Sequence, residues 1–272
     1  MSILSQLEAL TRPGALPALD APADRRASLG RLGRAALDLT KIGLPFAAAT
    51  ALTTDAQAQG TTPSPVEVFN FALLLEYLED EFYTQGLDTA GLVTGDRRPV
   101  IEQIRKHESA HVAFLTQAIT AAGGTPIDKP TFDFTAGGQF RDVFRNLQTF
   151  LTLAQAFEDL GVRAYKGQAA FLVGQGDLLT AALQIHSVEA RHAAKIRRLR
   201  GLDGWIRTNT GIQGVPATDP IYAGEENVTQ LMMDASSATL SGGVSAGVVT
   251  EAYDEPLTGS QVSTIATLFI NG

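Results

Sequence analysis

The chain has 272 residues, of which 44% are hydrophobic, and its formal net charge is −8. This length provides one domain with additions, or two small domains, with enough apolar residues for a core. The acidic balance argues against nucleic acid as the main partner, because phosphate binding needs clustered Lys and Arg. The chain has no cysteine, which excludes disulfides, thiolate zinc sites, iron–sulfur clusters and a cysteine nucleophile. Any metal ion must therefore be held by oxygen atoms and imidazole nitrogens.

Residues 1–60 form an N-terminal segment that is similar to a twin-arginine export leader. Arg25 and Arg26 precede the modest apolar stretch "IGLPFAAATAL", and Ala56 and Ala58 match a small-residue cleavage pattern. This pattern predicts export to the periplasm or the cell envelope. The alternative is an amphipathic helix that packs on the domain, in which case we expect a cytoplasmic protein. No uninterrupted apolar run approaches the ~20 residues of a transmembrane helix, so we expect no membrane span.

Residues 61–205 have the pattern of four helices. Ser64 is a suitable cap for the first helix, and Pro65 suits its first position. The paired glycines of "AAGG" at 121–124 should end the second helix. The expected bounds, in chain order, are 65 to about 86, about 100 to about 121, about 140 to 173, and about 177 to about 201.

The links between these helices are unequal in length. The first and second helices, and the third and fourth, are joined by short links, so each pair should form an antiparallel hairpin. About sixteen residues separate the two hairpins, which is enough to cross the length of a helix. The sequence therefore predicts an all-α four-helix bundle of two hairpins with a long crossover. Residues 206–272 should form a largely irregular extension with a short terminal helix, for which Thr258 and Gln261 have capping-box spacing.

Each of the four helices carries a Glu near the middle of a mainly apolar stripe. Residues three or four apart share one helical face, and such a face should point into the bundle. The first and third helices both contain Glu-x6-Tyr, and the second and fourth both contain Glu-x-x-His. The two hairpins are thus chemically alike, as expected from an internal duplication. The residues are Glu76 and Tyr83, Glu108 and His111, Glu158 and Tyr165, and Glu189 and His192.

Four carboxylates that converge in an apolar core need a compensating charge. Each unpaired buried charge costs several kcal/mol, and no Lys or Arg lies next to the glutamates on these stripes. Two divalent ions would offset the four negative charges, and the two histidines would add neutral ligands. A Glu and a His at positions i and i+3 can both reach one ion at ~2.0–2.2 Å. The predicted ligands of this dimetal site are Glu76, Glu108, His111, Glu158, Glu189 and His192.

These motifs resemble the ferritin-like dimetal-carboxylate superfamily over roughly residues 65–201. In that superfamily two helices each supply one Glu and two helices each supply Glu-x-x-His, so the resemblance implies the same six ligands here. Tyr83 and Tyr165 match the tyrosines that lie beside the ligands in that superfamily, so the resemblance implies that they are candidate catalytic residues. The alternative is that they are ordinary core tyrosines whose hydroxyls find a carboxylate, without a radical role. More narrowly, "NFALLLEYLEDEFYTQGL" and "EAYDEPLTGSQV" look like the desiccation-related ferritin-like proteins of bacteria and plants.

The resemblance implies two iron ions as the cofactor, with two manganese ions as the alternative, because oxygen and nitrogen ligands suit both. The first hypothesis is a redox protein that oxidises Fe(II) or consumes dioxygen or peroxide under oxidative or desiccation stress. A homo-oligomer is compatible with this hypothesis. Electrons for repeated turnover would come from an electron donor that the sequence does not identify. The second hypothesis is a subunit of an iron-storage cage. The third is a structural or stress-protective envelope protein in which the metal only stabilises the bundle.

Other polar residues near the predicted site fit less specific roles. His107 and His186 do not complete the repeat, so we expect them to be solvated or to lie between helices without binding metal. Asp80 shares the face of Glu76 and is either a further ligand or, as we prefer, the partner of an Arg or Lys. The basic run at 195–200 is expected at a helix C-terminus, where the dipole favours positive charge.

Overall fold

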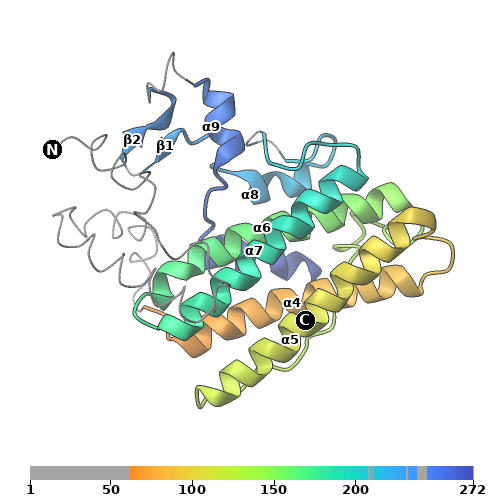
Figure 1. Cartoon of the computed structure of the whole chain (residues 1–272). Helices are drawn as coiled ribbons and strands as arrows, with labels where there is room; N and C mark the ends of the chain where they lie inside the picture. The colour runs from red at the N-terminus through yellow and green to blue at the C-terminus, as the bar shows by residue number, and fades with distance from the viewer. Residues whose placement is uncertain (1–61, 208, 210, 231, 238–243, 272) are drawn as a thin grey trace, which may run out of the picture. The chain divides into compact units, whose positions relative to one another are not determined.

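The computed structural model describes residues 62–271 except 208, 210, 231 and 238–243. The expected export leader lies outside the described residues. Within the described part, four long helices lie alongside one another as two hairpins (Figure 1). They are α4 (Pro65–Asp88), α5 (Arg98–Ala121), α6 (Leu147–Ala169) and α7 (Gly176–Leu199). Helix α4 packs mainly on α5 and α6 mainly on α7, and the hairpins meet through α4 and α6, so the predicted all-α bundle is confirmed.

The start of α4 follows from local chemistry. The Ser64 hydroxyl accepts the backbone N–H of Glu67, and the Glu67 carboxylate accepts the N–H of Ser64 at 2.7 Å. This capping box satisfies two donors that the first turn leaves free, and Pro65 has no N–H to satisfy. None of the helices in the described part of the chain is long and apolar enough to cross a bilayer.

The third helix begins later than predicted, at Leu147 instead of near Phe140. The side chain of Asn146 accepts a backbone N–H of the first turn and donates to the Asp142 carboxylate at 2.9 Å. Asn and Asp compete with helical backbone bonds in this way and so favour caps and turns. Phe140 and Val143 are buried in the core from this turn. Their apolar character therefore reflects tertiary packing and not a helical stripe.

The remaining elements are short and lie mostly after α7. The expected terminal helix is α10, and its capping box between Thr258 and Gln261 is present. The two strands pair antiparallel as a small hairpin. The elements are η3 (Gly95–Arg97), η4 (Ala170–Leu172), η5 (Pro216–Thr218), α8 (Asp219–Tyr222), β1 (Thr229–Gln230), β2 (Met233–Asp234), η6 (Ala235–Ser237), α9 (Ala246–Ala252), α10 (Gly259–Ala266) and η7 (Thr267–Phe269).

The C-terminal extension packs on α6 and completes the burial of that helix. Arg163 of α6 has no exposed surface. Its guanidinium donates to the backbone carbonyls of Ile221, Ala223 and Glu255 and pairs with the Glu225 carboxylate at 2.9 Å. Because a guanidinium presents several donors in a fixed fork, one side chain can hold several turns of an irregular segment. The extension is thus part of the same core as the bundle.

Candidate metal centre

The six predicted ligand residues are all buried in the middle of the bundle. Each of the four long helices contributes at least one of them. Helices α4 and α6 contribute one Glu each, and α5 and α7 contribute Glu-x-x-His. The side chains lie together because each stands on the apolar face by which its helix packs on the others. The structure therefore brings the predicted ligands to one place.

Their ligand atoms form two overlapping groups. In each group, the atoms lie within 4.8 Å of one another. Glu108 and Glu189 belong to both groups, so these two residues could hold both of a pair of ions. The first group is Glu76, Glu108, His111 and Glu189, and the second is Glu108, Glu158, Glu189 and His192.

The spacing within the first group fits ligands around one cation. The Nδ1 atom of His111 lies 2.9 Å from Glu108 Oε2, 3.1 Å from Glu76 Oε2 and 3.2 Å from Glu189 Oε1. One ring nitrogen carries at most one hydrogen, so it cannot satisfy three carboxylates. Ligand atoms that each lie ~2.1 Å from an ion, at right angles, are ~3.0 Å apart. A divalent ion therefore explains this convergence better than a hydrogen bond does.

The second group shows the same spacing. His192 Nδ1 lies 2.8 Å from Glu108 Oε1 and 3.4 Å from Glu158 Oε2, yet none of these three atoms makes a hydrogen bond among the described residues. Both carboxylate oxygens of Glu189 are also buried there without a hydrogen-bond partner. Buried polar atoms normally have partners. A metal ion would bind these oxygen and nitrogen atoms, which have no hydrogen-bond partner, so the residues fit a pair of ions.

The electrostatics of the centre indicate that protons would compete with a metal ion for it. Burial raises the pKa of Glu108 to about 7, although the hydrogen bond with His111 and the close approach of the His192 ring act in the opposite direction. Burial lowers the pKa of His111, but the adjacent carboxylates of Glu108, Glu189 and Glu76 outweigh this and raise it to about 12. Burial also lowers the pKa of His192, but the charge of Glu158 and the neighbouring carboxylates raise it to about 11. Metal ligation needs these groups deprotonated.

The two tyrosines link the hairpins in a symmetric exchange. Tyr83 of α4 donates to Glu158 Oε1 of α6, and Tyr165 of α6 donates to Glu76 Oε1 of α4, each at 2.5 Å. Both tyrosines are buried, and burial is the main reason why the pKa of each hydroxyl lies well above its usual value. The hydroxyls therefore remain protonated. They hold one oxygen of Glu158 and one of Glu76, while the second oxygen of each carboxylate faces a histidine of the centre.

His107 lies between helices, as expected, but it is not merely solvated. Its Nδ1 atom lies 2.8 Å from Nε2 of His192, and its Nε2 atom lies 2.7 Å from the Gln103 amide nitrogen. The second nitrogen of a metal-binding histidine usually has such a partner, which fixes the orientation of the ring. His107 is thus placed to orient His192 while Nδ1 of that ring faces the carboxylates.

Two residues near the centre differ from the expectation. Asp80 accepts a hydrogen bond from Ser109 of α5 at 2.5 Å, and not from the expected Arg or Lys. It does not belong to either group of ligand atoms. Glu79, which the sequence analysis did not single out, is 2% exposed and lies against the ligand glutamates. The available signal was the spacing Glu76-x-x-Glu79, which is the same i, i+3 spacing as in the two Glu-x-x-His motifs.

The basic run at 195–200 does more than complement the helix dipole. Arg197 is buried and forms an ion pair with Asp159 at 2.5 Å. The same carboxylate accepts the hydroxyl of Tyr222 from the C-terminal extension at 2.6 Å. This network lies one residue along α6 from Glu158, so it fixes α6 against α7 beside the metal centre.

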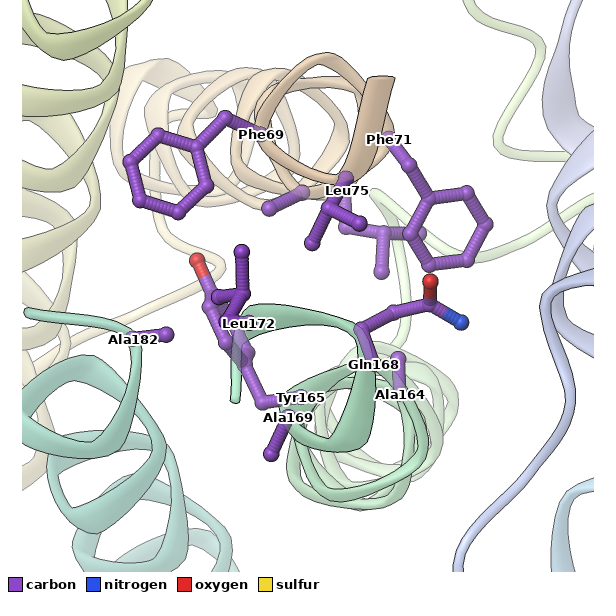
Figure 2. Close-up of a pocket in the computed structure, with 11 residues that line it drawn as sticks. Phe69, Phe71, Leu75, Ala164, Tyr165, Gln168, Ala169, Leu172 and Ala182 are labelled. Carbon is purple, nitrogen blue, oxygen red and sulfur yellow. The ribbon is translucent and has the colours of Figure 1, made fainter. Parts of the chain in front are cut away.

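A small pocket between α4 and α6 is lined in part by Tyr165 (Figure 2). It has a free volume of about 10 Å³, which is about the room that one water-sized molecule needs. Its walls are almost entirely apolar and include Phe69, Leu75 and Leu172. The Tyr165 ring is also part of this wall, and the hydroxyl of that ring donates to Glu76.

A comparison with known families matches residues 64–202, just over half of the chain, to the family described as "Ferritin-like domain". The matched region covers α4 to α7 and all six predicted ligands. A comparison with curated proteins found no match, so the closeness to desiccation-related proteins stays a prediction. The fold, the duplicated Glu and Glu-x-x-His pattern and the family match agree: the chain belongs to the ferritin-like domain family.

Proposed function

We propose that this protein is an oxidoreductase that binds two Fe(II) ions and oxidises them with dioxygen or peroxide. The observation that supports it best is the pair of four-residue groups that share Glu108 and Glu189. Two iron ions, when bound, would supply two electrons, which convert hydrogen peroxide and two protons to two water molecules, or dioxygen and two protons to hydrogen peroxide. Two manganese ions are the alternative, because the donor set is oxygen and nitrogen only.

The residues of the chain would prepare the site for this chemistry. The four ligand glutamates provide negative charge that favours the more highly charged, oxidised ions. Tyr83 and Tyr165 hold the outer carboxylates, and His107 holds His192. The surrounding apolar core excludes bulk water, which strengthens each of these interactions.

A role in oxidative or desiccation stress follows as part of the proposal, because oxidation of Fe(II) removes the ion that generates radicals from peroxide. We further propose export to the periplasm or cell envelope, on the basis of the twin-arginine pattern in residues 1–60. The electron donor, if peroxide is consumed catalytically, would be a separate reductant.

The test compares two substitutions on α5. Glu108 is buried in both ligand groups, whereas Glu102 lies on the same helix and pairs with Arg98 near the surface. The wild type, Glu108→Gln and Glu102→Gln are loaded with Fe(II) without oxygen and then mixed with dioxygen or peroxide. We expect rapid formation of protein-bound Fe(III) in the wild type and Glu102→Gln, and loss of it in Glu108→Gln. Equal oxidation rates in all three would contradict the proposal and favour a structural role for the metal.

A further inference from the structure

Glu79 is a buried carboxyl group that the six-ligand arrangement does not use. It lies on α4 one helical turn after Glu76 and is 2% exposed. Within the described part of the chain it has neither a hydrogen-bond nor an ion-pair partner. A carboxyl group buried without a partner destabilises a protein by ~1–3 kcal/mol or more. Its presence therefore calls for a compensating interaction.

The duplication shows that this position is a departure from symmetry. Glu76 and Glu79 on α4 correspond to Glu158 and Gly161 on α6, since both pairs are three residues apart. A Cβ atom at Gly161 would lie 3.3 Å from Oε1 of Glu79 and 3.3 Å from Oε2 of Glu189. Gly161 is not in the left-handed region, and glycine inside a helix is less stable than alanine by ~0.5–1 kcal/mol. The missing side chain gives Glu79 and Glu189 room to approach each other.

The charges around Glu79 all have the same sign. Burial raises its pKa well above the usual range, and the negative charges of Glu189, Glu158, Glu76 and Glu108 raise it further. Cations would reverse this effect, because they attract the carboxylate that the four glutamates repel. Among the described residues no Lys or Arg makes an ion pair with Glu79. The ions of the metal centre are therefore its natural partners.

We propose that Glu79 is a fifth carboxylate of the metal centre. It binds the two metal ions from the side of Glu189 when they are loaded. This inference rests on the proposed function, because it needs the ions to bind. Glu79 is not a member of either four-residue ligand group, so it reaches the ions by rotation of its side chain. A fifth negative charge exceeds what two divalent ions balance. It stays below the six positive charges that two trivalent ions carry after oxidation.

Manganese titration of the full chain tests this inference without any turnover. Mn(II) is added to wild type, Glu79→Gln and Glu81→Gln, and free Mn(II) is followed by electron paramagnetic resonance. Glu81 is the matched control, because it lies two residues further along α4 and pairs with Lys129 at the surface. Glu79→Asp keeps the charge but shortens the reach, and circular dichroism checks that each variant is folded.

Loss of a carboxylate of the centre should lower the affinity for at least one of the two ions about 10- to 100-fold. We expect this loss in Glu79→Gln, a smaller loss in Glu79→Asp, and wild-type binding in Glu81→Gln. Two ions bound with wild-type affinity in Glu79→Gln would show that Glu79 is only a neutral core residue, and would overturn the inference while the dimetal site stands. A wild type that binds no ion would overturn the proposed function and this inference together.

Discussion

Metal binding by this bundle should strengthen steeply as the pH rises. In the metal-free centre, the pKa of His111 is about 12 and that of His192 about 11. Both histidines therefore carry an extra proton at pH 6 to 8, and each must lose it before the nitrogen can bind a metal ion. Because the proton is bound only in the metal-free form, the affinity falls as the pH falls. Glu108, with a pKa of about 7, adds a further proton in the lower part of that range.

The size of the effect follows from the number of protons released. Burial also raises the pKa of Glu189 well above its usual value, so that carboxyl group adds to the protons released. With one proton from each histidine alone, the overall constant for binding two ions should rise at least about 100-fold per pH unit. Calorimetry with Mn(II) in buffers of different ionisation enthalpy counts these protons directly, and Glu102→Gln serves as the control. Release of less than one proton per ion pair, or an affinity that is constant between pH 6 and 8, would refute this view of the centre.

Three further predictions concern stability. Removal of the metal with a chelator should lower the melting temperature by about 10–20 °C, because two ions at 100 times their dissociation constants stabilise the fold by ~5 kcal/mol; calorimetric melting with and without metal measures this. In the metal-free protein, Tyr83→Phe and Tyr165→Phe should each reduce the free energy of unfolding by about 1–3 kcal/mol, since each leaves a buried carboxylate oxygen without its donor; urea denaturation measures this, with Tyr77→Phe as the control. Arg163→Met should leave the Glu225 carboxylate buried without its ion-pair partner and destabilise the protein by about 3–5 kcal/mol. Limited proteolysis should then cleave the extension after α7, and wild-type resistance would count against this role of Arg163.

The ligands could be predicted from the sequence because their signal is local. A Glu and a His three residues apart on an apolar helix face predict a shared site, and the duplication repeats that signal. Asp80 and Glu79 show where this reasoning ends. Asp80 lies four residues after Glu76 and Glu79 lies three residues after it. Viewed along the helix axis, their side chains therefore point to opposite sides of the Glu76 side chain. Only the packing of α4 on α6 decides that Glu79 faces the centre. Asp80 instead accepts a hydrogen bond from Ser109 of α5.

The rest of the fold depends on contacts between residues far apart in the sequence. The late start of α6 follows from the cap at Asn146 and from aromatic residues that pack from a turn. The extension is held by Arg163, whose backbone and side-chain partners lie about 60 to 90 residues further along the chain. A single buried Arg in an apolar helix carries no sequence signal that identifies such partners. The helical core of the fold was therefore predictable, and its covering segment was not.

The most direct test of the dimetal centre is a crystal structure of the manganese-loaded protein with anomalous scattering measured for the metal. Two peaks are predicted in the middle of the bundle, ~3.5–4 Å apart. One should lie against His111 and the other against His192, with Glu108 and Glu189 between them. A single ion, or ions bound only at the surface while the buried carboxylates keep their protons, would contradict the dimetal centre.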